Sequence, residues 1–377
     1  MKSKIATFIL FIIMILLLGI IGGVVWLVYS GADIETIIET FQEGDISTIV
    51  EQVTDSLNGN DTSENATNTN SNTSSTNKVT SSGTSTNTSD LSDNFYYSQL
   101  SDTQKIIYEA LNENKENMKT GTYKIEFGDQ FTDILEQEDG ATTLGDDYQA
   151  AIDAYTHDNP DLFYIDVSKM YLSIETTTRV LSKTYNVYIA PKDNETYYDD
   201  AFSSQAEVVT AIAEVEYIKD EILKNISDDD YYNIKLIHNY LIDNVEYDSN
   251  YESVNPYSIY GTLVQGQAVC EGYSRTFKYL LNAAGIECEL VQGSATNSEG
   301  TTQSHAWNIV YLEGKWYYVD TTWDDPVVIG NGILTDKYRY QYFLKGSKTF
   351  EKDHIEETQF VENGKEFYYP TASEDDY

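Results

Sequence analysis

An uncharged stretch near the N-terminus constrains this chain more than any other feature. No charged residue occurs from Ile5 to Ala32, and Ile5 to Val28 is almost wholly apolar. As a helix rising about 1.5 Å per residue, this run spans the roughly 30 Å hydrocarbon core of a bilayer. A cleaved signal peptide would have a shorter apolar core and an A-x-A-like site, which we do not find. We therefore expect a transmembrane anchor over residues 1–30.

The positive charges predict the orientation of this anchor. Lys2 and Lys4 precede the apolar run, and the next positive residue is Lys78. Positively charged flanks stay on the cytoplasmic side of a membrane. We expect a single-pass protein of the cell membrane with its C-terminal ectodomain outside.

The overall charge excludes some partners. The 377 residues include 62 Asp and Glu against 23 Lys and Arg, which gives a formal net charge of -39. Nucleic acid and anionic lipid headgroups both attract positive patches, so we expect no nucleic-acid partner and membrane contact only through the apolar helix. The 32 tyrosines exclude a wholly disordered chain.

Changes in composition divide the rest of the chain. Residues 31–58 are acidic with helically spaced apolar positions, and they predict a stalk that either self-associates or forms short helices beside the membrane. Ser, Thr and Asn fill 24 of the 32 positions from 59 to 90, so 59–92 is predicted to be a disordered linker. An N-terminal α+β domain is expected over 93–200 and a second domain over 201–377.

Local patterns predict α+β structure in the ectodomain. Helices are expected from Leu100 to Met118 with Ser101 as cap, from Ser204 to about Ile226, and from Asp229 to Val245. Three segments rich in aromatic and β-branched residues are predicted strands: 162–167 (LFYIDV), 169–176 (KMYLSIET) and 183–190 (KTYNVYIA).

One of the two cysteines occupies a position suited to nucleophilic chemistry. Residues 266–285 carry one apolar helical stripe that ends at Gly285, which places Cys270 at the start of a buried helix. The free N–H groups and dipole of a helix N-terminus stabilise a thiolate, and they can also receive an oxyanion. Cys288 lies in an apolar segment and is expected to be a core residue.

A thiol nucleophile needs a base, and only four histidines are present. His305 follows a polar loop and begins a predicted strand, HAWNIVYL, which leads through Glu313-Gly314 into a second strand ending at Asp320. With a two-residue turn, paired residue numbers sum to 627, so His305 and Asp320 share one face as diagonal neighbours within side-chain reach. The other three are expected to be dispensable for chemistry, His354 because it lies in a charged segment; they are His157, His238 and His354.

The two motifs together resemble a known family. VCEGYSRTFKYLLNAAGI (269–286) and SHAWNIVYLEGKWYYVDTTWDDP (304–326) are similar to the bacterial transglutaminase-like cysteine superfamily, and the resemblance spans about 231–326. It implies a papain-like fold with Cys270 as nucleophile, His305 as base and Asp320 as orienting acid. The oxyanion side chain stays open between Gln265 and Gln267. Trp307 is either a shield for the His–Asp contact or a core aromatic.

The resemblance implies acyl transfer or hydrolysis at amide bonds. The expected partner is a protein or peptide substrate, cell-wall peptides included, and no cofactor or metal is expected. The alternative function is a non-catalytic surface binding or scaffold module with the same fold.

Overall fold

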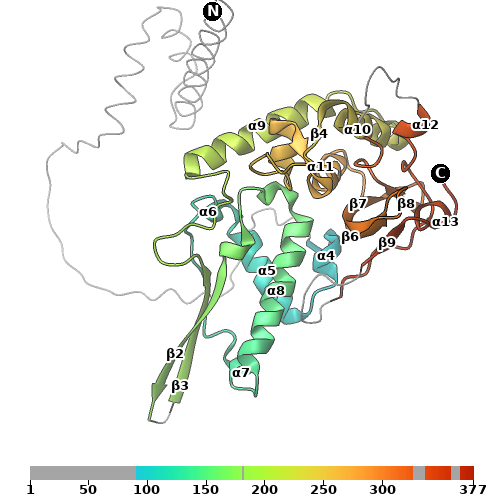
Figure 1. Cartoon of the computed structure of the whole chain (residues 1–377). Helices are drawn as coiled ribbons and strands as arrows, with labels where there is room; N and C mark the ends of the chain where they lie inside the picture. The colour runs from blue at the N-terminus through green and yellow to red at the C-terminus, as the bar shows by residue number, and fades with distance from the viewer. Residues whose placement is uncertain (1–90, 181, 326–335, 358–365) are drawn as a thin grey trace, which may run out of the picture. The chain divides into compact units, whose positions relative to one another are not determined.

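The helix that the sequence predicts after Leu100 begins at its predicted cap, Ser101. Ser101 and Gln104 form a reciprocal capping box that opens α5 (Asp102–Glu113), and α6 (Lys115–Met118) follows a break at Asn114. In this computed structural model, α5 lies beside α8 (Gly140–Asp158) (Figure 1). The structure describes residues 91–180, 182–325, 336–357 and 366–377.

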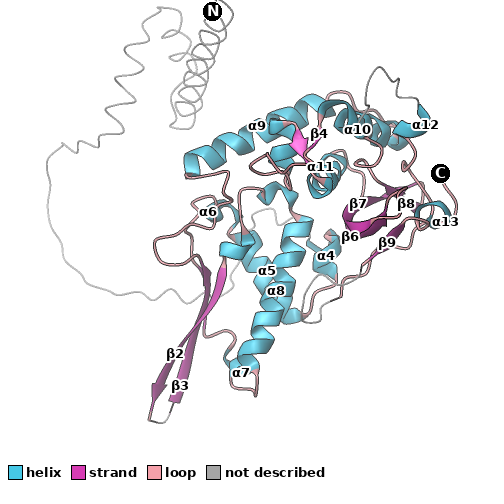
Figure 2. Ribbon diagram, viewed as in Figure 1, coloured by secondary structure: helices cyan, strands magenta, loops and turns pink. Residues whose placement is uncertain are grey.

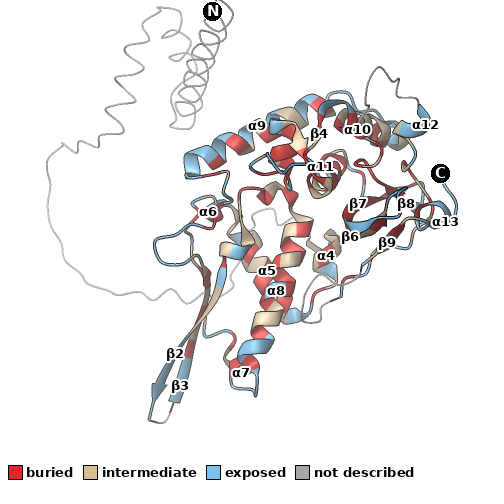
Figure 3. Cartoon of the chain, in the orientation of Figure 1, coloured by how far each residue is buried: buried red, intermediate tan, exposed pale blue. Residues whose placement is uncertain are grey.

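A three-stranded antiparallel sheet with order β1-β3-β2 completes this half. Its strands are β1 (Ile125–Gly128), β2 (Tyr171–Arg179) and β3 (Ser182–Ala190). The β2–β3 hairpin extends away from the helices, and its outer half is exposed (Figures 2 and 3). The two strands predicted at 169–176 and 183–190 are therefore confirmed.

The prediction of a strand at 162–167 was wrong. Pro160 opens a 3₁₀ turn (Pro160–Leu162), and a second 3₁₀ turn (Val167–Lys169) follows. The three consecutive residues 162–164 are all buried, whereas a strand points successive side chains to opposite faces. Their aromatic and apolar character thus reflects a packed corner of the core.

Two long helices lead into the second half of the described chain. Ser204 caps α9 (Gln205–Leu223) through the N–H of Glu207, although the Glu207 carboxylate accepts from the Ser203 N–H instead of completing a box. Asp229 caps α10 (Asp230–Asn244), at the position where the sequence predicted this helix to begin.

The last part combines one helix with a four-stranded antiparallel sheet of order β8-β7-β6-β9 (Figure 2). The helix is α11 (Cys270–Ala283), preceded by the two-residue strand β5 (Gln267–Ala268), which pairs with β4 (Glu246–Tyr247). The sheet contains β6 (Cys288–Thr296), β7 (Thr302–Leu312), β8 (Lys315–Val319) and β9 (His354–Glu356). The remaining short helices are α4 (Phe95–Ser98), α7 (Thr132–Leu135), α12 (Asp336–Arg339) and α13 (Ser347–Phe350).

The hairpin register is the one calculated from the sequence. Leu312 pairs with Lys315 and Asn308 pairs with Val319, so paired numbers sum to 627. Glu313 and Gly314 have φ of 50° and 84°. Two positive φ angles define the two-residue turn whose twist matches that of the flanking strands.

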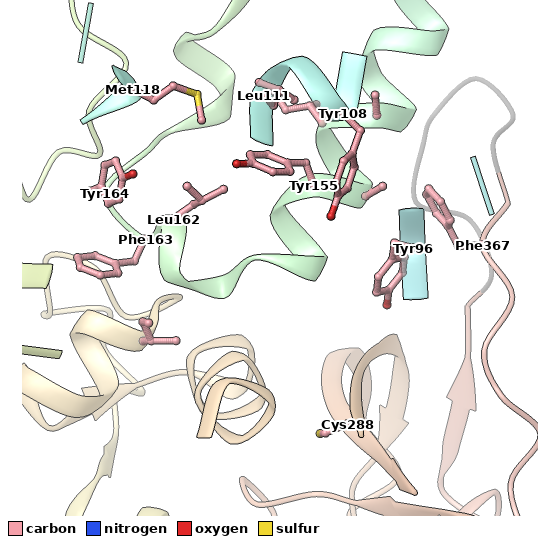
Figure 4. Close-up of a cluster of buried hydrophobic side chains, with 14 of the residues drawn as sticks. Tyr96, Tyr108, Leu111, Met118, Tyr155, Leu162, Phe163, Tyr164, Cys288 and Phe367 are labelled. Carbon is pink, nitrogen blue, oxygen red and sulfur yellow. The ribbon is translucent and has the colours of Figure 1, made fainter. Parts of the chain in front are cut away.

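One hydrophobic core connects the helices of the first half with α11 and the sheet. It runs from Tyr96 on α4 to Phe367 near the C-terminus and includes Cys288 on β6 (Figure 4). The described residues, from Leu91 onward, form one compact unit. The mixed α and β architecture agrees with the predicted class, while the division at residue 200 stays a prediction.

The predicted anchor, stalk and linker lie at residues 1–92, almost wholly outside the described residues. Within the part of the chain that the structure describes, no helix has the length and apolar character needed to cross a membrane.

Candidate active site

Cys270 is the first residue of α11, as the apolar stripe predicted. Val269 is the extended N-cap residue, and its N–H donates to the Pro256 carbonyl at 3.0 Å, which fixes the chain just before the helix. Gly272 allows close packing here, because a Cβ at this position would lie 2.4 Å from the Pro256 carbonyl oxygen. Cys270 is half-buried and is a free thiol.

His305 and Asp320 meet as the register predicted. The Nε2 atom of His305 lies 2.7 Å from Oδ2 of Asp320, and both side chains are almost completely buried. Cys270 lies close enough to this imidazole to help raise the pKa of His305. Because the Nε2 atom of His305 contacts Asp320, Nδ1 is the ring nitrogen that can accept the proton of the Cys270 thiol. Cys270, His305 and Asp320 thus lie together at one site, with a hydrogen-bond contact between the last two.

The electrostatics of the pair favour a charged imidazole. Burial by itself lowers the pKa of His305, but Asp320 and then Cys270 outweigh it and hold that pKa well above its ordinary value. Burial raises the pKa of Asp320, yet His305 and His354 together hold it well below the usual range. An imidazolium beside a carboxylate is the arrangement that these opposite shifts describe.

The Asp320 carboxylate is held on both oxygens. Oδ1 accepts the backbone N–H groups of Thr322 at 2.9 Å and of Trp323 at 3.1 Å. Oδ2 faces His305 and also His354, whose Nε2 lies 3.2 Å away. Four contacts leave the carboxylate little freedom to rotate.

His354 lies beside the site, although its charged segment led us to expect it to be dispensable for chemistry. It begins β9, is 1% exposed, and contacts the same Asp320 oxygen as His305. The charged residues around His354 suggested an exposed segment, but pairing of β9 with β6 buries the imidazole. The sequence contains one indication of this neighbouring strand: a glycine, Gly293, lies inside β6, and such a glycine often marks the close approach of another backbone. In the structure, a Cβ at Gly293 would come within 2.1 Å of the Ile355 carbonyl oxygen on β9.

Comparison with known proteins agrees with the geometry. Residues 217–321 match the model of the transglutaminase-like superfamily, and this range contains Cys270, His305 and Asp320. The chain contains a transglutaminase-like domain. Kyphoscoliosis peptidase from Mus musculus is 37% identical over 94 residues, and the Homo sapiens protein is 36% identical over 97 residues. Each match covers 23% of this chain and only 14% of the relative's length.

Similar solved structures align only in part. A structure described as a TGase has 18% identity and a TM-score of 0.27, covering 46% of this chain and 50% of the other. The periplasmic domain of TgpA from Pseudomonas aeruginosa has 13% identity and a TM-score of 0.23, covering 41% of this chain and 63% of the other.

Aromatic rings surround His305 and His354, the two histidines beside Asp320. The Trp307 ring lies 6.0 Å from the His305 ring and stands edge-on to His354 at 5.1 Å. The Trp323 ring lies 5.4 Å from His305 and 4.6 Å from His354. Trp307 also belongs to a small buried cluster on the sheet. Trp307 is therefore a core aromatic residue and also shields the two histidines, so the two roles predicted from the sequence are compatible.

The side of the domain near Cys270 carries exposed tyrosines. Burial and then the charge of Cys270 raise the pKa of Tyr247 to about 12, so its hydroxyl stays protonated beside the thiol. Tyr251 and Tyr257 are exposed and their rings stack at 6.3 Å. Asp248 fixes the loop between them by accepting the N–H groups of Glu252 and Ser253. Tyr247, Tyr251 and Tyr257 were not predicted as part of the site from the sequence.

The two glutamine candidates differ in their surroundings. Gln265 is exposed, and its side-chain oxygen accepts a hydrogen bond from the Ser253 hydroxyl at 2.6 Å. Gln267 is half-buried in β5. Neither is selected by these contacts, so both stay candidates for the oxyanion donor.

The other two histidines have partners away from Cys270. His238 is buried on α10, with its Nε2 3.0 Å from Oδ2 of Asp324. His157 is buried on α8, with its Nδ1 2.7 Å from the Asp153 carbonyl oxygen. Burial and the nearby Arg275 lower the pKa of His157 to about 3, so this ring is neutral at physiological pH.

Three side chains at the site could serve as metal ligands. His305, Asp320 and His354 each offer an atom, and these atoms lie within 4.8 Å of one another. Two histidines and a carboxylate are ligands that several transition metals accept. A metal bound by all three would compete with the hydrogen bond between His305 and Asp320.

Proposed function

We propose that the transglutaminase-like domain is a thiol enzyme that transfers an acyl group at amide bonds of proteins or peptides. One observation carries this proposal: His305 has Cys270 nearby and its Nε2 atom 2.7 Å from the Asp320 carboxylate. Such an arrangement activates a nucleophile, holds the imidazole in one tautomer and stabilises the imidazolium.

The reaction begins with attack of the Cys270 sulfur on the amide carbonyl carbon. The thiol proton resides on His305, whose raised pKa favours the imidazolium. When the tetrahedral intermediate collapses, His305 gives this proton to the leaving amine and a thioester remains on Cys270. Water or a second amine then attacks the thioester and passes a proton to His305. Cys270 then leaves as the thiolate while the proton stays on His305, which restores the starting state.

The oxyanion needs donors beside Cys270. The first-turn N–H groups of α11 have no partner within the helix, and they lie at its positive end. Gln265, Gln267 and the Tyr247 hydroxyl are the side-chain candidates.

Hydrolysis and amine transfer differ only in the acceptor. The name of the curated relatives, kyphoscoliosis peptidase, supports water as acceptor, although the match covers 14% of their length. Incubating the ectodomain with a glutamine-bearing protein and a labelled primary amine distinguishes the two. Labelled protein indicates crosslinking, and released ammonia or new termini without label indicate hydrolysis.

Alkylation tests whether the site is active at all. Iodoacetamide at pH 6 should label Cys270 far faster than free cysteine, and Cys288→Ala should leave that rate unchanged. If Cys270 reacts no faster than free cysteine, the domain is better described as a non-catalytic binding or scaffold module.

The location of the enzyme is also a proposal. The uncharged run from Ile5 to Ala32 and the two preceding lysines support a membrane anchor with the catalytic domain outside the cell. Protease added to cells without their outer wall should remove everything beyond about residue 59. Full protection of the chain would contradict this topology.

A further inference from the structure

His354 stands beside the proposed triad because of the way two strands flank β6. His305 on β7 pairs with Gly293, and His354 on β9 pairs with Ala295. Residues 293 and 295 point to the same face of the sheet. Their side chains are at most a methyl group, so both imidazoles have room above β6, with ring centres 5.7 Å apart.

Both nitrogens of His354 are used. Nε2 lies 3.2 Å from Oδ2 of Asp320, and Nδ1 lies 2.7 Å from Oδ1 of Asp353. The Asp353 carboxylate also accepts the Tyr342 hydroxyl at 3.0 Å. The Phe350 ring stacks on the imidazole with centres 4.1 Å apart. The ring is therefore held on its edges and its face, and its orientation toward Asp320 is fixed.

This arrangement differs from ordinary packing of a buried histidine. Among the described residues, backbone N–H groups hold Oδ1 of Asp320, whereas Oδ2 contacts the side chains of His305 and His354. During the reaction His305 gives up and regains a proton, so its own hold on Oδ2 changes in each cycle. His354 takes no part in that proton transfer and can hold Oδ2 throughout.

We infer that His354 is a positioning residue, which keeps the Asp320 carboxylate aligned with His305 and is itself oriented by Asp353. The working unit is then a chain of five: Cys270, His305, Asp320, His354 and Asp353. This inference rests on the proposed function. It goes beyond the superfamily match, which ends at residue 321 and includes neither His354 nor Asp353.

Two amide variants separate this role from packing. The amide nitrogen of glutamine reaches the place of the imidazole Nε2, whereas that of asparagine reaches only the place of Nδ1. His354→Gln can therefore still donate a hydrogen bond to Asp320. His354→Asn loses that hydrogen bond and keeps only the contact with Asp353. Both variants lose the stacked ring equally, so packing alone predicts the same effect for both.

The matched control is His238→Asn. His238 is also fully buried, and its Nε2 also contacts an aspartate, Asp324, at 3.0 Å. It has no contact with Asp320 among the described interactions. Each variant is made in the full ectodomain, and its melting temperature is recorded. The measured quantities are the rate of Cys270 alkylation by iodoacetamide at pH 6 and kcat with the amide substrate.

We expect His354→Asn to lower kcat and the alkylation rate by about 10- to 100-fold, the effect of losing one hydrogen bond to a charged group. His354→Gln should recover most of that loss, and His238→Asn should stay within about threefold of the wild type. Equal rates for the asparagine and glutamine variants would overturn the inference. If the wild-type thiol reacts no faster than free cysteine, the proposed function fails instead.

Discussion

Replacing Asp320 by asparagine tests the proposed mechanism most directly, because it changes one atom and a charge. Asparagine must turn its NH₂ group toward one of the two positions that Asp320 oxygens now occupy. Facing the N–H groups of Thr322 and Trp323, the NH₂ would meet two donors. It therefore turns toward His305 and donates to Nε2.

This hydrogen bond forces the His305 imidazole into the opposite tautomer. His305 then carries its proton on Nδ1, the atom facing Cys270, and it can no longer accept the thiol proton there. The same tautomer error in a serine-type triad costs roughly 10⁴-fold in kcat. We expect a loss of about 10³- to 10⁴-fold in kcat for Asp320→Asn, with KM nearly unchanged because the buried carboxylate does not face the substrate.

The variant also changes how stability depends on pH. The raised His305 pKa contributes stability that is complete below about 6.5, the ordinary histidine value, and is lost as pH rises toward the folded value. The depressed Asp320 pKa contributes stability above about 3.9, which is lost as pH falls further. The difference in unfolding free energy between wild type and Asp320→Asn should therefore be largest between about pH 4 and 6.5.

Single-turnover kinetics and urea unfolding at several pH values measure both effects. Asp324→Asn is the matched control, since Asp324 is equally buried and pairs with His238 instead of His305. A kcat for Asp320→Asn within tenfold of the wild type would refute the orienting role, provided that the control behaves like the wild type.

Three further predictions follow from burial and composition. Cys270→Ala should abolish activity and labelling of the native protein. Cys288 is buried, which raises its pKa far above the usual range, so it should be labelled only after unfolding. Labelling of Cys288 in the native protein, detected by mass spectrometry, would contradict this. His157→Asn should lessen acid sensitivity, because the wild type loses up to about 1.4 kcal/mol per pH unit below 6.5 in charging this buried ring; a pH-independent difference from pH 4 to 7 would contradict this. Deleting residues 59–90 should leave the ectodomain's melting temperature unchanged, and a drop of several degrees would show packing.

Local sequence determined the parts of the site that short connections control. The apolar stripe after Cys270 specified a helix, and the helix specified where the thiol sits. The Glu313-Gly314 turn specified the β7–β8 register, and that register brought His305 and Asp320 together. In each case the residues that fix the geometry are neighbours in the chain, so a helical period or a turn length was sufficient.

The tertiary structure decided the rest. The segment 162–167 has strand-forming residues, but it turns because three consecutive side chains are buried together. His354 looked peripheral, but β9 pairs with the far edge of β6 and buries it against Asp320. No turn joins β6 to β9, so no local rule sets their register. Only the packing of the whole sheet, with Gly293 making room for the β9 backbone, places the second imidazole on the carboxylate.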